Sequence, residues 1–495
     1  MSAELPFRIE EATVEDIHAA YRAGTITARG VVEKYLARIE AYDRKGPALW
    51  SLISINDNAL AEADTLDAGF LATGKFAGPL HGIPVLVKDN IDVAGMETTG
   101  GTATLKGWKP PKDATIIRKL REAGAIMLAK TTMSELARGG VDSINSVLPG
   151  FARNPYNTAH ATGGSSGGTG SALAANFGTI GLGSDTWGSI RNPSTNNSIV
   201  GLRPSWAIVS RAGMIGLYNA RDVAGPMART VADLAAMLDV LVGVDPDDPA
   251  THGTQDKVPP SFKALLTTNG LKGKRIGVLR QAFPDEKSDR QVLALFTRAL
   301  EDLAAAGATI VDPVTIPEFD DHPPKPHPKS ETRRAMEAYL AKTGPGFPKT
   351  LADIAASGKF HPLHETMFLT TMVAPRPEDD PIAAQLERDE ARMREAYLHA
   401  MAAAYVDCLI TPCASYPPKL HGDRDITPMG SCTWIASGLH WPALIVPMGF
   451  THEDLPSGLQ FIGRPFSDAQ LIEAGYAYEQ ATKHRHPPGT VPPLS

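Results

Sequence analysis

The sequence predicts an α/β fold: a large, mostly open β-sheet covered by helices on both faces. Two observations point to this class. Short apolar, β-branched runs alternate with amphipathic helical segments along most of the chain, as in repeated strand–helix units. The chain is also long enough, at 495 residues with 43% hydrophobic and 21% charged content, to bury a sizeable core.

The chain opens with two predicted helices. Thr13 and Asp16 form a capping box, and the helix that they begin ends at Gly24. A second helix is predicted over 28–42, and we expect its apolar stripe to pack on the main body. The stripe consists of Val31, Val32, Tyr35, Leu36 and Ile39.

A strand, a helix and a second strand follow. The apolar run 84–87 is typical of a buried strand, and Lys88 stands at its end. Asp113 is expected to cap a helix that extends through Ala123. The chain then returns as a strand over 125–129.

The same alternation continues to the end of the sequence. Thr230 and Asp233 form a second capping box, for a helix closed by Gly243. The other predicted strands are 179–182, 199–202, 275–279, 308–311, 408–411 and 443–447. The other predicted helices are 167–177, 292–305, 382–404 and 470–482.

The acidic segment 244–253 is the best candidate for a boundary or a long surface loop. We expect 1–65 to form an N-terminal helical segment packed on the body, and 66–245 to form the core with the candidate site. Residues 246–495 would complete the same α/β domain. Within them, 312–385 is rich in proline and weakly periodic, which favours an insertion near the site mouth or a mobile lid.

Composition excludes several classes of partner and location. The formal net charge of −7 gives neither a basic surface for nucleic acid nor a polybasic membrane anchor. The N-terminus lacks the apolar region of a secretory signal, and prolines and glycines interrupt the uncharged stretch 428–450. The 3 cysteines show no CxxC spacing, so we expect a cytoplasmic protein without structural disulfides. His322 and His327 are interpreted as solvated loop residues rather than metal ligands.

The stretch 163–205 holds the candidate catalytic serines, Ser165 in GGSSGG and Ser189 in GSDTWGSIR. Its dense glycines indicate positive φ angles or close backbone approach. The pattern around Ser165 fits the nucleophile elbow of an α/β-hydrolase, although a loop precedes it where the elbow needs a strand. A set of Ser189, His160 and Asp185 is another alternative, but nothing in the sequence brings these residues together.

A serine–lysine mechanism accounts for more of these residues. A lysine acts as a base only when it is neutral, which requires burial or nearby cations. Lys88 follows the apolar run PVLV, which would carry it into the interior, whereas a lysine at a strand end is usually a surface residue. A glycine-rich nucleotide-binding module is disfavoured because no GK[ST] follows the loop and no GxGxxG follows a strand.

Several ordered segments together resemble the amidase signature family. They are GIPVLVKDNIDVAG, GGSSGGTGSALAA, GLGSDTWGSIRNPS with GLRPS, GPMARTVADLA, and PALIVPMG with PSGLQFIG. The resemblance covers about residues 10–485, with the strongest motifs between 80 and 240. It implies the amidase signature fold.

The resemblance also implies a Ser-Ser-Lys triad. Ser189 would be the nucleophile, Ser165 the bridging serine, and Lys88 the general base and acid. Family members hold the bridging serine after a cis peptide, which would here be Gly164–Ser165. Ser166, Asp185 and Arg191 are expected to hold the loops in place by hydrogen bonds.

Backbone amides beside the nucleophile would form the oxyanion hole. The resemblance assigns this role to Thr186, Trp187 and Gly188, with Ser189 itself. Trp187 departs from the family pattern, since many members carry a small residue there, and its indole would fill or line the acyl pocket. Met133 matches a position that borders the acyl site in some relatives, and a core methionine is the alternative.

The predicted function is an amidohydrolase that cleaves a carboxamide, including aryl or other bulky amides, to an acid and ammonia or an amine. The reaction would pass through a seryl acyl-enzyme and need no metal or other cofactor. The alternatives are a carbamate or ester hydrolase with the same triad, and an amidotransferase A-type subunit. The expected partner is a small-molecule amide, with no nucleic acid and no membrane, and the expected state is a monomer or homodimer.

Overall fold

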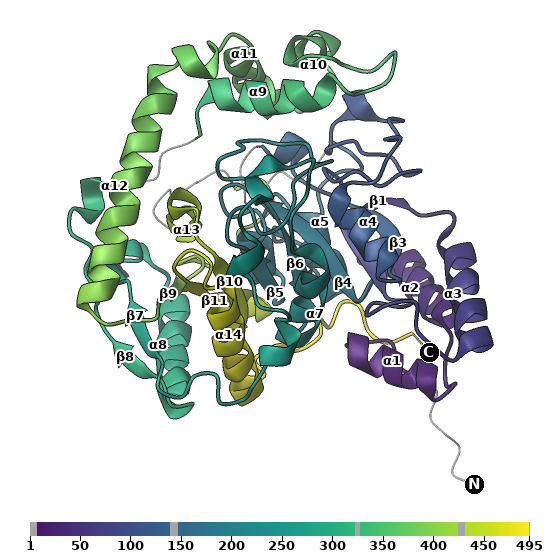
Figure 1. The fold of residues 1–495 in the computed structure, drawn as a ribbon, viewed down its shortest axis with the longest axis horizontal. Coiled ribbons are helices and arrows are strands. Elements are labelled where there is room, and N and C mark those ends of the chain that lie inside the picture. The colour runs from purple at the N-terminus through teal and green to yellow at the C-terminus, as the bar shows by residue number, and fades with distance from the viewer. Residues whose placement is uncertain (1–6, 139–146, 322–326, 424–430, 495) are drawn as a thin grey trace.

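A single 11-stranded sheet forms the centre of the chain (Figure 1). In this computed structural model, residues 7–138, 147–321, 327–423 and 431–494 are described. The sheet order is β1-β3-β2-β4-β6-β5-β10-β11-β9-β7-β8. The strands are β1 (Leu52–Ile55), β2 (Pro84–Lys88), β3 (Ile126–Thr131), β4 (Ile180–Asp185), β5 (Val200–Arg203), β6 (Val223–Ala228), β7 (Arg275–Val278), β8 (Thr309–Val311), β9 (Cys408–Pro412), β10 (Ala443–Phe450) and β11 (Pro456–Ile462).

The sheet is mixed. β2 is parallel to β3 and β4, and β7 is parallel to β8 and β9. The other pairs are antiparallel, and β10 and β11 join the two groups of strands by pairing with β5 and β9. The first 65 residues supply the edge strand β1 as well as helices.

Helices pack around the sheet, and no described helix combines the length and apolar character needed to cross a bilayer. The helices are α1 (Val14–Arg22), α2 (Ala28–Tyr42), α3 (Ala59–Thr73), α4 (Thr115–Glu122), α5 (Gly167–Ala174), α6 (Arg191–Asn196), α7 (Val231–Leu241), α8 (Arg290–Ala305), α9 (Lys329–Leu340), α10 (Leu351–Ser357), α11 (Glu365–Met372), α12 (Pro381–Ala403), α13 (Thr433–Leu439) and α14 (Asp468–Thr482).

Alternation along β10 shows that both faces of the sheet are covered. Leu444 points towards α14, because a Cβ added to Gly475 of α14 would lie 2.3 Å from Leu444 Cδ2. The next residue, Ile445, points the other way, because Gly458 approaches both Ile445 and Thr195 of α6. Successive strand side chains face opposite sides of a sheet, so α14 and α6 lie on opposite faces. The predicted fold class is confirmed.

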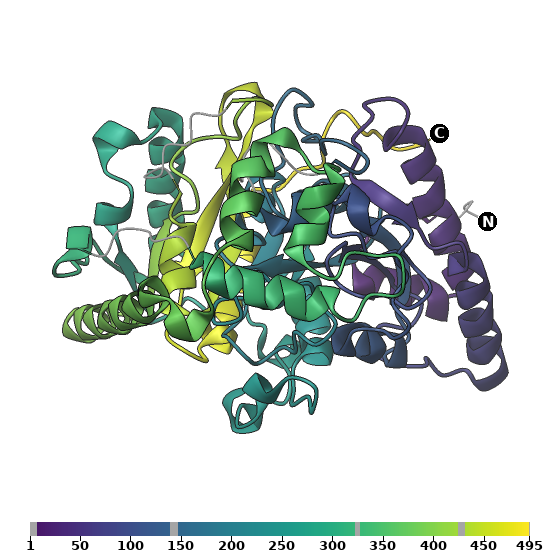
Figure 2. The same ribbon diagram turned by 90° about the horizontal axis from the view of Figure 1, so that it is seen from above.

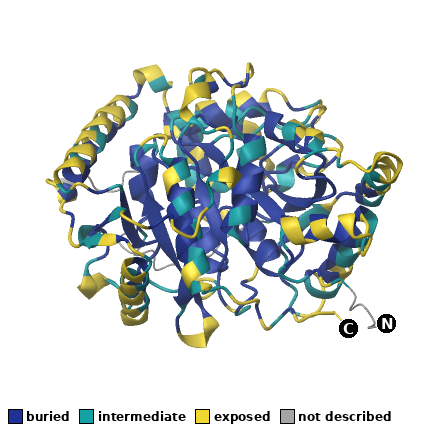
Figure 3. Cartoon of the chain, turned by 60° about the horizontal axis from the view of Figure 1, so that its bottom comes forward, coloured by how far each residue is buried: buried dark blue, intermediate teal, exposed yellow. Residues whose placement is uncertain are grey.

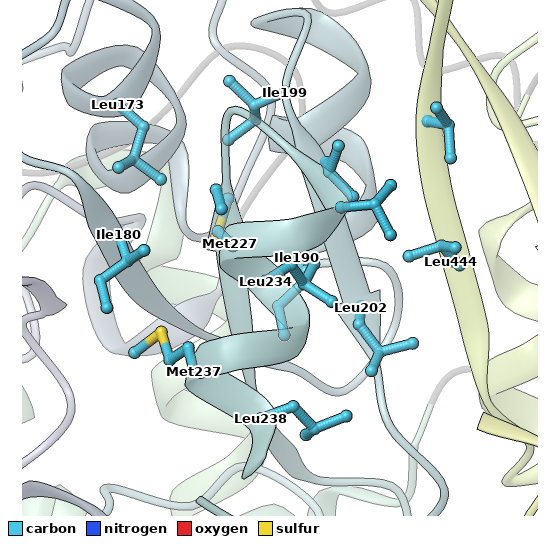
Figure 4. Packing of buried hydrophobic residues seen from close by; sticks show 14 of the residues in the cluster. Leu173, Ile180, Ile190, Ile199, Leu202, Met227, Leu234, Met237, Leu238 and Leu444 are labelled. Carbon is cyan, nitrogen blue, oxygen red and sulfur yellow. The ribbon is translucent and has the colours of Figure 1, made fainter. Parts of the chain in front are cut away.

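The strands are buried along most of their length, and the exposed residues lie mainly on the outer helices and loops (Figure 3). Figure 4 shows the packing of α7 on the sheet. Leu234 and Leu238 of α7 lie among Ile180, Leu202 and Met227 of neighbouring strands. This continuous core fixes the strand ends, where the candidate site lies.

The capping boxes differ in how well they match the prediction. The box of Thr13 and Asp16 is confirmed, with both of its reciprocal hydrogen bonds present. At α7, Thr230 accepts the Asp233 amide, but the Asp233 carboxylate accepts from the Val14 amide at 2.9 Å instead of closing the box. A tertiary contact with α1 therefore replaces half of this local motif.

The prediction that Asp113 caps α4 is wrong. The N-cap residue is Ala114, which offers no side-chain acceptor. Asp113 instead accepts from the Ala94 amide at 2.7 Å and from Arg121 Nε at 3.1 Å. Its carboxylate ties a preceding loop to the helix rather than satisfying the helix end.

The segment 312–385 contains the helices α9, α10 and α11, which group along one side of the molecule (Figures 1 and 2). α12 then leads the chain back towards β7 and β9. The three helices share a small hydrophobic cluster with loops of the main body. Its buried members are Leu105, Leu136, Ile215, Leu217, Met336, Tyr339, Leu340, Leu351, Ile354 and Phe368.

Candidate active site

Lys88 occupies the end of β2, beside the end of the parallel strand β4. Because the carboxyl ends of parallel neighbours meet at one edge of a sheet, Lys88 comes close to Ser184. Its Nζ atom donates to Ser184 Oγ at 2.8 Å, to the Ser184 carbonyl at 3.2 Å and to Ser165 Oγ at 2.7 Å. Asn90 Nδ2 also donates to Ser184 Oγ, at 3.0 Å. The sheet thus aims the lysine at Ser165.

The environment of Lys88 favours the neutral amine. The side chain is completely buried and forms no ion pair with a carboxylate of the described residues. Burial lowers its pKa to about 7, an effect that the more distant charges of Asp185 and Asp222 partly oppose. A large fraction of the lysine is therefore unprotonated near neutral pH.

Ser165 lies just before α5, after a cis Gly164–Ser165 peptide bond. Its carbonyl accepts from the Ser134 amide at 3.1 Å, which places the completely buried Met133 one residue from this contact. On the other side, the Ser166 amide donates to the Ser189 carbonyl at 3.1 Å. The structure therefore brings the backbone of both predicted serines together next to Lys88.

Ser189 follows the end of β4 in the loop before α6. Its side chain is buried, with 8% exposure, and its hydroxyl forms no hydrogen bond with any of the residues that the structure describes. A serine hydroxyl that is not held by a structural partner can be oriented by a substrate or by a neighbouring base.

Asp185 anchors the loop that carries Ser189. Its carboxylate accepts from Arg191 at 3.0 and 3.1 Å, from Arg203 at 3.0 Å, and from the Gly188 and Ile190 amides at 2.9 and 3.1 Å. Burial would raise the pKa of Asp185, but the two guanidinium groups outweigh it and hold that pKa below its ordinary value. The carboxylate is charged and fully engaged, as the expected role in loop positioning requires.

The structure corrects one part of the predicted oxyanion hole, the amide of Gly188. Its N–H donates to Asp185 Oδ1 at 2.9 Å, so this amide is not free to donate to a substrate. The amides of Thr186, Trp187 and Ser189 have no acceptor among the described residues. Asp222 also holds this loop, since Thr186 Oγ1 donates to its carboxylate at 2.5 Å.

Gly188 cannot be replaced without moving its surroundings. Its φ of +118° is a conformation that favours glycine, and an added Cβ would lie 2.4 Å from Thr433 Oγ1. Thr433 Oγ1 in turn donates to the Trp187 carbonyl at 3.0 Å. The start of α13 therefore presses against the loop and defines its path.

Trp187 is held by residues far away in the sequence. The Arg221 guanidinium lies 4.6 Å from the centre of the indole and 5.4 Å from the ring centre of Tyr218. Arg221 Nε donates to Glu390 of α12 at 2.6 Å. The indole is thus half-buried against a cation that α12 fixes, which accounts for a large residue in this loop.

The alternative serine–histidine reading fails on geometry. His160 Nδ1 contacts the Pro418 carbonyl at 2.6 Å, and its Nε2 lies 3.4 Å from Glu453. Both ring nitrogens therefore have partners other than Ser189. The elbow reading of Ser165 also fails, because the described residues between β3 and Ser165 contain no strand.

The described histidines form no metal site. His327 is half-buried rather than solvated, and it stacks on Tyr218 with ring centres 6.3 Å apart, whereas His322 lies outside the described residues. Over the described parts of the chain, no three His, Cys, Asp or Glu side chains form a group that could hold a metal ion. The 3 cysteines, Cys408, Cys413 and Cys432, are buried and free of disulfides.

Sequence reasoning missed several residues that complete this site. Ser184 and Asn90 contact Lys88 directly or through one hydrogen bond, and Thr433 supports the Trp187–Gly188 turn. Ser184 and Asn90 had a signal, because they lie in the GSD and KDN motifs beside the predicted serine and lysine. Thr433 depends on tertiary contacts.

The chain is similar to known proteins over nearly its whole length. The model of the Amidase family matches residues 30–472. A protein named probable amidase from Arabidopsis thaliana is 32% identical, with 97% of this chain and 92% of the relative covered. The A subunit of glutamyl-tRNA(Gln) amidotransferase from Synechococcus sp. (strain CC9311) is also 32% identical, over 95% of this chain and 98% of that protein.

A solved structure of another protein has a very similar fold. The crystal structure of a peptide amidase in complex with the competitive inhibitor chymostatin matches with a TM-score of 0.87 and 36% sequence identity. The match covers 97% of this chain and 99% of the peptide amidase. The chain therefore belongs to the amidase family and is a hydrolase that acts on amide C–N bonds.

Proposed function

We propose that Lys88, Ser165 and Ser189 form the catalytic triad of this amidase. The observation that carries the proposal is the 2.7 Å separation between Lys88 Nζ and Ser165 Oγ. A buried lysine with a pKa of about 7 can accept a proton at neutral pH, and Ser165 would pass one on to it from Ser189.

In the first half of the reaction, neutral Lys88 takes a proton from Ser165, which takes one from Ser189. Ser189 Oγ attacks the amide carbonyl carbon, and the oxygen becomes an oxyanion. We assign its stabilisation to the amides of Thr186, Trp187 and Ser189, each such donor being worth about 3 kcal/mol. Lys88 then returns the proton through Ser165 to the leaving nitrogen, the C–N bond breaks, and an acyl ester remains on Ser189.

In the second half, water replaces the amine. Lys88, neutral again, draws a proton from the water through Ser165, and the water oxygen attacks the acyl carbon. The ester bond to Ser189 breaks, the Ser189 oxygen regains a proton, and the carboxylic acid leaves. We propose a small-molecule amide as substrate, a contact between its acyl group and Met133, and a cytoplasmic location.

Covalent labelling tests the nucleophile. A fluorophosphonate should label the wild-type chain once, and peptide mass spectrometry should place the label on Ser189. Ser189→Ala should abolish labelling, whereas Ser261→Ala, whose hydroxyl bonds Asp239, should not change it. A label that persists at the same stoichiometry in Ser189→Ala would reject the assignment.

The relationship to the A subunit of glutamyl-tRNA(Gln) amidotransferase favours one alternative function. In that case this chain would act within a complex with further subunits. Purification of the tagged chain from its own cells, followed by mass spectrometry, separates the two. Stoichiometric partner subunits would support the amidotransferase reading, and turnover of simple amides by the isolated chain would support the hydrolase.

A further inference from the structure

Arg138 carries a buried positive charge that the rest of the described chain leaves unmatched. The residue as a whole is half-buried, but its Nη2 atom is buried and has no hydrogen-bond partner among the described residues. A guanidinium that leaves water without a partner loses several kcal/mol of hydration. Such a group persists where a ligand supplies the missing partner.

The nearest acidic side chain along the sequence does not balance this charge. Glu135 Oε2 accepts from the His361 amide at 3.0 Å and lies 2.9 Å from His364 Nδ1. No ion pair joins Glu135 to Arg138. Burial alone lowers the pKa of Arg138, to about 10, with no carboxylate opposing the shift. The guanidinium is therefore still charged at neutral pH.

Arg138 lies close to the catalytic segments. It follows the single turn that begins at Ser134, whose amide holds the Ser165 carbonyl, and its own amide donates to the Glu135 carbonyl at 2.9 Å. Arg138 is thus four residues from the amide that holds the bridging serine.

His327 and Arg221 connect Arg138 to the nucleophile loop. Besides burial, the charges of Arg138 and Arg221 both lower the pKa of His327, and the His327 ring stacks on Tyr218. Arg221 covers the indole of Trp187, two residues before Ser189. Arg221 already pairs with Glu390, and burial together with both arginines lowers the pKa of His327 well below its ordinary value. Of these two arginines, Arg138 is the one that forms no ion pair with a carboxylate of the described residues.

We propose that Arg138 binds a carboxylate on the substrate, so that the preferred amides carry an acid group near the scissile bond. This inference rests on the proposed function, because it takes the substrate to bind beside Ser165 and Ser189. A guanidinium offers two parallel N–H donors that match a carboxylate, which makes it more selective for this group than a single ammonium.

Matched pairs of substrates test the inference. One pair is hexanamide and adipic acid monoamide, and another is benzamide and terephthalic acid monoamide. The monoamides of malonic, succinic and glutaric acid vary the distance between the two groups. The readout is the ratio of kcat/KM for the acid-bearing amide to that for its neutral partner. We expect the ratio to exceed one for at least one wild-type pair.

Arg138→Gln should lower that ratio by about 10- to 100-fold, mainly through KM, which is the range for one lost charge-assisted hydrogen bond. Arg138→Lys should restore part of the loss because it keeps the charge, and it also serves if the glutamine variant does not fold. The matched control is Arg392→Gln, an arginine of α12 that is 67% exposed. Ratios that stay at the wild-type value in both Arg138 variants would overturn the inference.

A binding measurement separates this inference from the proposed function. Calorimetry with Ser189→Ala should detect the acid-bearing amides, and adding Arg138→Gln should weaken that binding by the same factor. If Ser189→Ala binds them but the wild type hydrolyses no amide, the proposed function fails and the carboxylate site stands. If the wild type hydrolyses neutral amides and Ser189→Ala binds no acid-bearing amide, only the carboxylate site fails.

Discussion

Lys88 Nζ lies 2.7 Å from Ser165 Oγ at the carboxyl end of β2, in surroundings that exclude water from the lysine. A lysine is an effective base only after it loses its proton. Burial alone lowers the pKa of Lys88 here. The charged groups that act on the amine, Asp185 and Asp222, are acidic and raise that pKa. Under the proposed mechanism, the rate of hydrolysis would therefore depend on the ionisation of this one side chain.

The first prediction concerns pH. The pKa of Lys88 is lowered from 10.5 to about 7, so the active neutral form exists above about pH 7 and is lost as pH falls. We expect kcat/KM for a neutral amide to rise about tenfold per pH unit below 7 and to level off above it. A profile measured between pH 5 and 9 checks this, and a flat acid limb would exclude Lys88 as the base.

The second prediction concerns Ser184, whose hydroxyl accepts from Lys88 Nζ at 2.8 Å. An acceptor stabilises the protonated amine, so Ser184→Ala should lower the pKa of Lys88 further and move the acid limb to lower pH. Ser171→Ala is the control, because Ser171 bonds the Arg153 carbonyl instead. A shift of the limb to higher pH in Ser184→Ala would contradict the assignment.

The third prediction concerns stability. Asp185→Asn removes the charge that balances the buried Arg191 and Arg203, and it should lower the free energy of unfolding by about 3–5 kcal/mol. The pKa of Asp185 is lowered on folding. The free energy of unfolding of the wild type should therefore fall as the pH drops below the ordinary range of carboxyl pKa values. Urea unfolding of the variant at pH 7, and of the wild type at decreasing pH, measures both effects.

The control for this stability measurement is Asp64→Asn. The Asp64 side chain is 55% exposed and pairs with Arg29 at the surface, so its loss should change the unfolding midpoint little. Equal destabilisation by the two variants would show that the buried network of Asp185 has no special weight.

The fourth prediction concerns Gly188. An alanine there would place its Cβ 2.4 Å from Thr433 Oγ1 at a φ of +118°, so Gly188→Ala should shift the loop and reduce kcat by more than about 100-fold. Gly253→Ala tests the conformational effect alone, because Gly253 has a φ of +83° and nothing within 4 Å of an added Cβ. That control should keep its kcat, and Gly188→Ala with wild-type kcat would show that the loop position is unimportant.

Local signals explain which features could be predicted. The run before Lys88 is continuously apolar, so its strand follows from the sequence, whereas the position of Lys88 at the strand end left its burial open. Thr13 and Asp16 satisfy a helix end within four residues, which needs no tertiary information. The bond from the Gly188 amide to Asp185 is also local, and the turn-forming tendency of aspartate was the signal for it.

Other features depend on contacts that no short stretch encodes. The strand β11 contains Gly458 and Gln460, and its burial depends on pairing with β9 and β10 and on a bond from Gln460 Nε2 to Thr411. The strands β1 and β6 and the helices α3, α6, α9, α10, α11 and α13 escaped prediction as well. Glu390 stabilises Arg221 from α12, 169 residues away in the sequence.

The sheet order also has a consequence for how the chain is synthesised. Everything from β1 to β6 emerges from the ribosome first, yet β5 has no partner on its outer side until β10 is made more than 200 residues later. Until then the nascent protein presents an unpaired, apolar strand edge, which is a template for aggregation. Expression should therefore respond strongly to chaperone supply, and fragments that end before residue 443 should accumulate in inclusion bodies.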